Sequence, residues 1–338
     1  MRRHARSWIC AITALAALST LACGRSKDSP AGSGSDTKAA RSAAAEPAAG
    51  DLGPTKLTVA AIAIVDTAPL FLGQAKGFFA ENHLELTVQN TQGGADSVPG
   101  VVSGQYQFAF ANVVSLLLAH TKGLPLKMVA AGNSSTGKAE DFAAIVVPPG
   151  SAIKAMKDLE GKTLAVNQLN NIGGVTVRAA MRKAGADPDK TKIIEIRFPE
   201  MPAALGEKRV DAAWVVEPFL TVARNQGATV LDWNFADASP DLMIAAYFTT
   251  KDYVQAHPDV VKRFTAAMNK SLTYAAEHPD EARAILLTYT KIDKAVTDKL
   301  NLPRWTPQIN VASINLVADL LVQDKLLTTK PDITTLLP

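Results

Sequence analysis

The stretch DLEGKTLAV, residues 158–166, decides the fold, because an α/β pattern that has already run once along the chain begins again there. The first run starts at KLTVAAI, residues 56–62, a short segment rich in residues that favour strands. Short strands and single helices alternate after it, and the same alternation follows residue 166. Two such runs predict two α/β lobes, each built on a parallel sheet with helices on both faces.

The hydrophobic periodicity places the expected elements along the chain. In the first run we expect strands at 56–62, 84–88, 107–110 and 126–130, and helices at 69–79, 95–102 and 113–120. In the second run we expect strands at 158–166, 193–196, 212–215 and 230–231, and helices at 175–184, 203–208 and 219–226. From about Leu242 the pattern predicts mainly helices, at 259–277, 280–289, 294–300 and 309–326.

The restart and the late helical segment together predict the domain organisation. The first lobe is expected to comprise residues 55–147 and 245–338, and the second lobe residues 148–244. The chain would then cross between the lobes near Val147 and again near Ala245. The helices after the second crossing are expected to pack mainly on the first lobe.

The first residues indicate export. Arg2, Arg3 and Arg6 precede an uncharged, mostly apolar run at residues 9–21. That run is too short to span a bilayer, which needs about 20 apolar residues. A basic start, a short apolar run and small residues at its end are typical of a secretory signal peptide, and a buried N-terminal helix is the alternative.

The end of the apolar run, STLACG at residues 19–24, resembles a bacterial lipobox. Ala22 fits the small residue before the cysteine, whereas Thr20 departs from the usual leucine. The resemblance implies a signal peptide over residues 1–23 and lipidation of Cys23, with ordinary signal cleavage as the alternative. Two acyl chains on one cysteine give stable membrane anchoring.

Residues 24–54 consist mostly of Gly, Ser, Ala, Pro and scattered charges, a composition that predicts a flexible tether. The only cysteines in the chain are Cys10 and Cys23, so the body after the tether has no disulfide, cysteine-ligated metal or thiol nucleophile. His residues have no partners at metal-ligand spacing, and we expect neither a metal nor a cofactor.

Charge and motifs exclude two function classes. The chain has 35 Lys and Arg against 32 Asp and Glu, and the three arginines of the signal account for the whole excess. No basic patch stands out, so no nucleic-acid partner is expected. GNSSTGKA, residues 132–139, has the glycine and lysine spacing of a phosphate-binding loop but lacks its Ser or Thr. No catalytic set is recognisable, and we expect a protein that is not an enzyme.

Several motifs in consistent order resemble the nitrate/sulfonate/taurine branch of ABC-importer binding proteins, which includes relatives that bind the thiamine pyrimidine precursor. They are DTAPL at 66–70, GFF at 77–79, LEL at 84–86, GG at 93–94, FAN at 110–112, KGLP at 122–125, DLEGKT at 158–163 and RVDAAWVVEP at 209–218. The resemblance covers roughly residues 55–240. It implies a type 2 periplasmic-binding fold with the ligand in a cleft between the lobes, and an ATP-driven importer as partner.

Candidate ligand-binding residues lie where strands end and helices begin, the usual ligand position in open α/β sheets. Helix N-termini there offer unpaired N–H groups, and glycines allow close approach of a ligand. For each asparagine the alternative is a helix cap or a turn. The candidates of this kind are Asp66, Thr67, Gly93, Gly94, Asn112, Asn167, Asn170, Asn171 and Gly173.

Two acidic residues bear on ligand charge. Asp66 in a cleft would repel nitrate or a sulfonate and favour an amine or amidine-like donor, with capping of the following helix as the alternative. Glu217 is a further candidate, or else a surface acid at a helix start. Met201 could line the cleft, with helix-start geometry as the alternative. Trp214 on its strand is read as a core residue.

These features favour an exported, lipid-anchored solute-binding protein of an ABC importer. It would capture a sulfonate, nitrate or thiamine-pyrimidine type of solute and deliver it to the permease and its ATPase. We expect a monomer in the periplasm or on the outer face of the cytoplasmic membrane, with outer-membrane anchoring left open. The alternatives are an enzyme of the pyrimidine-precursor type on the same fold, against which the cysteine-free body argues, and a ligand-sensing adaptor lipoprotein.

Overall fold

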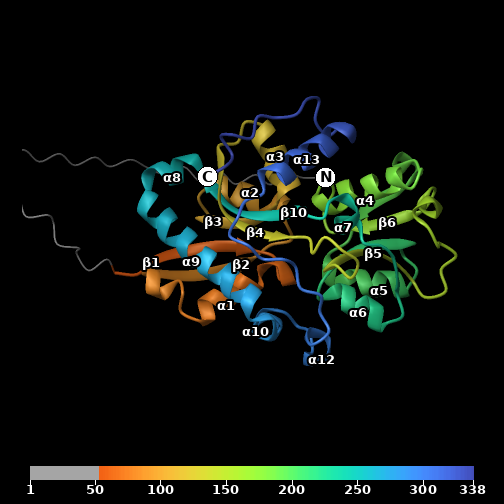
Figure 1. Ribbon diagram of the computed structural model, residues 1–338, viewed down its shortest axis with the longest axis horizontal. Helices are drawn as coiled ribbons and strands as arrows, with labels where there is room; N and C mark the ends of the chain where they lie inside the picture. The colour runs from red at the N-terminus through yellow and green to blue at the C-terminus, as the bar shows by residue number, and fades with distance from the viewer. Residues whose placement is uncertain (1–52) are drawn as a thin grey trace, which may run out of the picture. The chain divides into compact units, whose positions relative to one another are not determined.

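The computed structural model describes residues 53–338, which form two separate five-stranded sheets with helices packed on each (Figure 1). The predicted signal peptide, the lipidation site at Cys23 and nearly all of the predicted tether lie outside the described residues. The chain leaves the first sheet after residue 134 and returns to it at residue 243.

The first sheet has the strand order β2-β1-β3-β10-β4. Its strands are β1 (Thr55–Ala61), β2 (Leu84–Asn90), β3 (Phe108–Asn112), β4 (Leu126–Ser134) and β10 (Met243–Thr250). β1 runs parallel to β2 and β3, whereas β10 lies antiparallel between β3 and β4. All but the last residue of β10 are buried, which fits a central strand.

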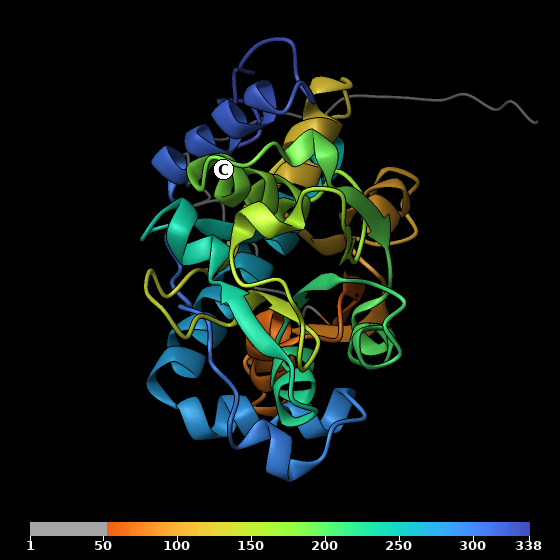
Figure 2. The ribbon, with the colours of Figure 1, turned by 90° about the vertical axis from the view of Figure 1, so that its right-hand side faces the viewer.

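The second sheet has the order β7-β6-β8-β5-β9. Its strands are β5 (Ala143–Val147), β6 (Thr163–Val166), β7 (Lys192–Glu195), β8 (Ala212–Val216) and β9 (Thr229–Asp232). β6 runs parallel to β7 and β8, and β5 lies antiparallel between β8 and β9. Figure 2 turns this side of the molecule toward the viewer.

Each sheet is therefore mixed, and the prediction of parallel sheets was wrong. The reason is the same in both: the strand that follows each crossing, β5 or β10, enters its sheet antiparallel. Neither strand was predicted, because short continuous apolar runs such as AAIVV cannot be told from buried helix by periodicity. Since β5 already belongs to the second sheet, the first crossing precedes Ala143 rather than lying near Val147.

The helices divide between the sheets. Beside the strands of the first sheet are α1 (Ala68–Ala75), α2 (Gly94–Val102), α3 (Val113–Thr121) and, after β10, α8 (Lys251–Ala256), α9 (Pro258–Glu277), α10 (Pro279–Ala284), α11 (Leu286–Tyr289), α12 (Lys294–Thr297) and α13 (Val311–Gln323). Between the strands of the second sheet are α4 (Ile172–Lys183), α5 (Met201–Gly206), α6 (Phe219–Asn225) and α7 (Asn234–Ala238).

The long helix α9 secures the first sheet. Its apolar face buries Phe264, Met268 and Leu272, and the ring of Phe264 stacks on Phe108 of β3 with centroids 3.9 Å apart. α9 also packs along α1 and β4. The last long helix, α13, packs on both α3 and α4 and thus touches elements of both sheets.

Among the residues that the structure describes, none of the helices combines the length and the apolar character that a membrane crossing requires.

Candidate functional site

A small cavity lies between the two sheets, where strand ends of both converge. Its walls are formed by Ile62, Ile64, Asp66, Phe110, Asn112, Ile244 and Ala245 from the first sheet and its connections, and by Asn167, Asn171, Ile172, Phe198, Trp214, Val216 and Phe235 from the second. We call it the inter-sheet cavity. Its volume of about 30 Å³ is room for one or two water molecules, so an organic ligand needs the walls to move apart.

The position of the cavity follows from the topology. Asp66 comes after β1 in the short 3₁₀ helix η1 (Val65–Thr67), and Asn112 ends β3. In the second sheet, Asn167 comes directly after β6 and Val216 ends β8. The cavity therefore occupies the carboxyl ends of parallel strands from two sheets, which is where α/β folds bind ligands.

Asp66 is the acidic residue of the cavity wall, and a protein hydrogen bond reaches one of its two carboxylate oxygens. The residue is 3% exposed, and its Oδ1 accepts a hydrogen bond of 2.9 Å from Nδ2 of Asn133. Its Oδ2 has no partner among the described residues. Burial raises the pKa of Asp66 from 3.8 to about 7, because the hydrogen bond from Asn133 only partly offsets the loss of water.

Two more buried polar groups near Asp66 lack partners within the described part of the chain: Oδ1 of Asn133 and the hydroxyl of Tyr247. Tyr247 is a residue of β10, and both burial and the charge of Asp66 raise its pKa far above the ordinary value. The phenol therefore stays a neutral hydrogen-bond donor. Buried polar groups are nearly always paired, so such a group of unmet atoms indicates a place where something else binds.

Aromatic rings form much of the remaining wall. Trp214 of β8 lies with its ring centroid 5.5 Å from those of Phe198 and Phe235, and Phe110 of β3 contributes from the first sheet. The indole Nε1 of Trp214 is buried and has no acceptor among the described residues. The second sheet thus offers an unused donor, whereas the first offers an unused carboxylate oxygen.

Four of the predicted residues come together at the cavity: Asp66, Asn112, Asn167 and Asn171. The capping alternatives are also observed. Oδ1 of Asn112 accepts from the backbone of Ser115 at the start of α3, and Oδ1 of Asn171 accepts from Gly174 N at 3.0 Å at the start of α4. Each asparagine therefore fixes a helix end and faces the cavity at once, and contact with a ligand stays a prediction.

Seven of the predicted residues do not line the cavity, and three of these are held by contacts with their own surroundings. Thr67 donates to the carbonyls of Ile62 and Ile64, which closes the turn after β1. Met201 is fully buried at the start of α5. The physical reason is the same for both: their side chains serve the local packing of the turns in which they lie.

Glu217, the third of these residues, accepts hydrogen bonds from the first turn of α6 and from Asn301. Its carboxylate accepts from the backbone N–H and the hydroxyl of Thr221, at 2.9 and 2.8 Å, and from Asn301 N at 3.3 Å. Burial raises the pKa of Glu217 to about 7, against these hydrogen bonds. The prediction that Glu217 reports the charge of the ligand is therefore not supported by its position, because its oxygens serve Thr221 and Asn301.

The predicted glycines pack closely against protein atoms, and Gly94 also lines a surface hollow beside α2 and α3. A Cβ on Gly173 would stand 2.1 Å from the ring of Trp214, and one on Gly94 would stand 2.4 Å from Cβ of Ser115. Gly93 meets the side chain of Gln168 in the same way. Asn170, with a φ of +53°, lines two other surface hollows and not the inter-sheet cavity.

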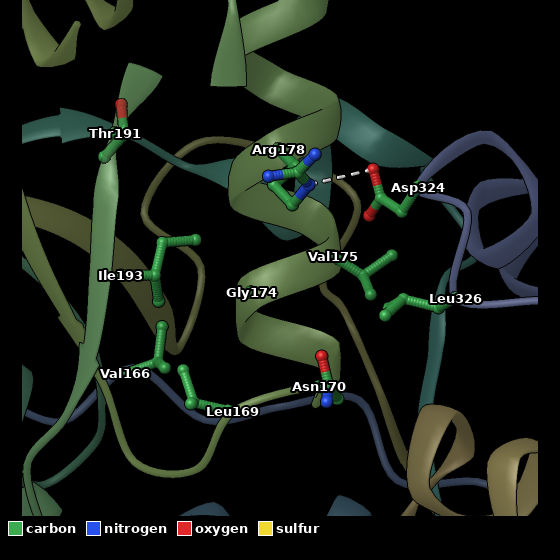
Figure 3. Close-up of a pocket in the computed structure, with 10 residues that line it drawn as sticks. All are labelled: Val166, Leu169, Asn170, Gly174, Val175, Arg178, Thr191, Ile193, Asp324 and Leu326. Atoms are coloured by element: carbon green, nitrogen blue, oxygen red, sulfur yellow. Dashed lines mark hydrogen bonds and ion pairs between the residues drawn. The ribbon is translucent and has the colours of Figure 1, made fainter. Parts of the chain in front are cut away.

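A larger groove of about 280 Å³ lies beside α4 (Figure 3). Its charged residues already have partners: Arg178 contacts Asp324 at 3.1 Å and Asp189 at 2.5 Å. Most of the rest of its wall is apolar, with Val166, Leu169, Val175, Ile193 and Leu326. Asp324 and Leu326 follow α13 and the other lining residues come from the second sheet and its connections, so no strand end of the first sheet reaches this groove.

Sequence reasoning missed Asn133, Phe198, Phe235 and Tyr247, and treated Trp214 as core only. Tyr247 lies on the unpredicted strand β10, and Asn133 lies beyond the end predicted for the fourth strand. Phe198 comes directly before a Pro at the start of a helical segment, a signal that could have been used. Residues 53–338 contain no group of three or more His, Cys, Asp or Glu side chains placed to hold a metal.

The family model described as NMT1/THI5 like matches residues 64–282. The chain belongs to this family. Among its relatives, the taurine-binding periplasmic protein of Escherichia coli is 26% identical over 214 residues, which cover 63% of this chain and 64% of the relative. The formylaminopyrimidine-binding protein of Halalkalibacterium halodurans is 24% identical over 224 residues, 65% of either chain.

Solved structures agree with the family. The alkanesulfonate-binding protein of Xanthomonas axonopodis pv. citri, bound to MOPS, superposes with a TM-score of 0.72 over 85% of this chain and 99% of its own, at 18% identity. At that identity the likeness establishes the fold, which is the predicted periplasmic-binding fold. The relatives are binding proteins, which confirms the expectation of a binding protein rather than an enzyme. This chain is thus a member of the NMT1/THI5-like family, and the relatives named above are binding proteins.

Proposed function

We propose that this protein captures, outside the cytoplasm, a small organic solute that carries a cationic or hydrogen-donating nitrogen, and delivers it to an ABC permease. The observation that supports the substrate class is the unmet carboxylate oxygen of Asp66 in the wall of the inter-sheet cavity. A donor nitrogen of the ligand would pair with it, and would lower the pKa of Asp66 by favouring its ionised form.

The same carboxylate disfavours a bare anion such as nitrate. Two like charges about 4 Å apart repel by roughly 4 kcal/mol at the effective dielectric of a partly buried site. Among residues 53–338, no Lys or Arg lines the inter-sheet cavity to offset that repulsion. A ligand with an amino group and an acceptor fits better, because the acceptor would take the free N–H of Trp214. Taurine, named in one relative, is such an amino compound.

The aromatic wall favours a ligand with a flat or apolar part. Phe110, Phe198, Trp214 and Phe235 offer ring faces and edges on both sides of the cavity. Ligand pockets are usually mostly apolar, with a few placed polar groups that fix orientation. An aminated heterocycle offers a donor for Oδ2 of Asp66 and an acceptor for Nε1 of Trp214, and formylaminopyrimidine, named in another relative, belongs to that class.

Capture requires the two sheets to separate, because about 30 Å³ admits no organic solute. We propose two lobes, built on the first and second sheets, that open and close by a hinge at the two crossings. Lipid anchoring at Cys23 and the tether of residues 24–54 would hold the protein beside its permease. Mass spectrometry of the native protein tests the anchor: an unmodified mature start or an uncleaved signal peptide would disprove it.

A thermal-shift panel tests the substrate class. The purified protein is melted with aminopyrimidines, amidines and taurine, and in parallel with nitrate and alkanesulfonates that lack an amine. A ligand at 100 times its Kd adds about 2.7 kcal/mol of apparent stability. We expect stabilisation by compounds of the first set, its loss in Asp66→Ala, and its retention in Asp252→Asn, which removes an exposed acid on α8. Stabilisation by the anions alone would refute the proposal.

A further inference from the structure

The two sheets are bridged at a second place, away from both crossings. Residues 92–95, the end of the loop after β2 and the first residues of α2, meet Asn167 and Gln168, which follow β6. Nδ2 of Asn167 donates to the carbonyl of Gln92 at 2.9 Å, and the backbone N–H of Ala95 donates to Oε1 of Gln168 at 3.3 Å. We call these four residues, Gln92, Ala95, Asn167 and Gln168, the latch.

Gly93, between the two bonded residues of the first sheet, is shaped for this contact. A Cβ on Gly93 would stand 2.1 Å from Oε1 of Gln168, and the residue adopts a φ of +156°, which L side chains rarely take. Gln168 is 7% exposed, so its long side chain is held against the turn rather than moving in water. The close approach of the two segments therefore depends on both residue types.

The latch is continuous with the ligand cavity. The same amide of Asn167 that donates to Gln92 accepts, through Oδ1, from Nδ2 of Asn171. Asn171 in turn caps α4 through Gly174, and both asparagines line the inter-sheet cavity. A group that contacts Asn167 or Asn171 thus touches the residues that hold the turn of the first sheet.

We propose that Asn167 and Gln168 are positioning residues that latch the two sheets together and link occupation of the cavity to closure. The linkage to ligand rests on the proposed function, whereas the latching itself does not. Another cross-sheet bond, from Val65 N to the carbonyl of Glu217 at 3.0 Å, lies beside the first crossing, because Glu217 N bonds to Phe142. Because of that position, we expect this bond to persist when the latch opens.

The test measures opening directly and needs no ligand. The described body contains no cysteine, so a single cysteine in the cavity wall reports opening by its reaction with a maleimide. Val216→Cys places a thiol of similar size at a position that is 2% exposed. The full chain carries Cys10→Ser and Cys23→Ser, so that only this thiol reacts. The labelling rate then follows the fraction of molecules that are open.

We expect Gln168→Ala and Asn167→Ala each to speed labelling roughly 2- to 10-fold, the effect of losing one hydrogen bond on the ratio of open to closed molecules. Gln255→Ala, on the exposed face of α8, removes a glutamine without a cross-sheet bond and should leave the rate unchanged. Circular dichroism melts verify that each variant is folded at the labelling temperature.

A second pair of variants distinguishes loss of the latch contact from a general loss of stability. Gly93→Ala pushes a Cβ into Gln168 and should speed labelling at least as much as Gln168→Ala. In Gly93→Ala/Gln168→Ala the obstructing side chain is gone, so the rate should match that of Gln168→Ala alone. Gly104→Ala, at a φ of +79° with open space around it, controls for backbone strain.

Unchanged labelling in Gln168→Ala and Asn167→Ala would overturn the latch. A full additional effect of Gly93→Ala in the Gln168→Ala background would do the same, since strain rather than contact would then be its cause. Neither outcome bears on the substrate panel, which measures ligand binding. Conversely, a panel in which no amine binds would refute the proposed substrate class and leave the latch result standing.

Discussion

Replacing Asp66 by asparagine removes a buried charge that the fold accommodates poorly. Burial raises the pKa of this side chain from 3.8 to about 7. The folded protein therefore holds a proton that the unfolded chain has released between about pH 4 and pH 7, and the contribution of Asp66 to stability falls as the pH rises through that window. At 1.36 kcal/mol for each pKa unit, the ionised carboxylate costs up to about 4 kcal/mol above pH 8.

Asp66→Asn keeps the shape of the side chain and its acceptor for Nδ2 of Asn133. We expect the free energy of unfolding to rise by about 1–4 kcal/mol at pH 8, because the neutral amide avoids the desolvation of a charge. At pH 5 the folded carboxyl is protonated while the unfolded one is mostly ionised, so the rise should be about 2–3 kcal/mol smaller than at pH 8. Urea denaturation of parent and variant at the two pH values measures both differences.

Glu217→Gln is the matched control. This carboxyl is also buried, with its pKa also raised to about 7, but its oxygens accept from Thr221 and Asn301. A glutamine must turn its NH2 group toward the backbone N–H of either Thr221 or Asn301, so at pH 5 it should lower stability by about 1–3 kcal/mol. The prediction is refuted if Asp66→Asn destabilises the protein at pH 8, or stabilises it equally at pH 5 and pH 8. Either result would mean that the folded protein compensates the charge of Asp66.

Three further outcomes are expected. Affinity for a cationic ligand should fall about tenfold for each pH unit below the pKa of Asp66, about 7, because protonation removes the countercharge; calorimetry between pH 5 and 8 that finds a flat profile would contradict this. Asn171→Ala should lower the free energy of unfolding by about 0.5–2 kcal/mol, because the cap of α4 is lost. If Asn171 also contacts the ligand, the loss of that contact should weaken binding by roughly 1–3 kcal/mol, whereas a cap alone leaves the affinity unchanged. Gly173→Ala should cost about 1–3 kcal/mol in a urea melt by pressing on Trp214, whereas Gly174→Ala, 3.7 Å from its nearest neighbour, should cost little.

The two runs of α/β elements were predictable because amphipathic helices and half-buried strands each repeat apolar residues at a characteristic spacing, which can be recognised in a single sequence. The helix starts at Asn112 and Asn171 were recognisable for the same reason, since a capping side chain precedes each apolar run. The antiparallel strands were not. β5 and β10 are buried on both faces, so no alternation marks them, and their direction is decided by which neighbours they meet after a crossing.

The site was predictable in part for a related reason. Residues that end parallel strands converge by topology, and Asp66, Asn112 and Asn167 were named on that basis. Glu217 could not be separated from them, because its distinguishing feature is a hydrogen bond to Asn301, 84 residues later in the chain. Tyr247 needed knowledge of β10, which no local signal provides.

The unmet groups of the cavity also explain why a ligand would favour the closed arrangement. Oδ2 of Asp66 belongs to the first sheet, and Nε1 of Trp214 belongs to the second. Each binds bulk water when the sheets separate, whereas closure without ligand leaves room for one or two waters at most and gives neither group a protein partner. A buried group left unpaired costs about 1–3 kcal/mol. A solute with a donor and an acceptor satisfies both groups in one step, and it does so only when the two walls face each other. The ligand therefore binds the closed form more tightly than the open form. This difference in affinity shifts the population of molecules toward the closed form.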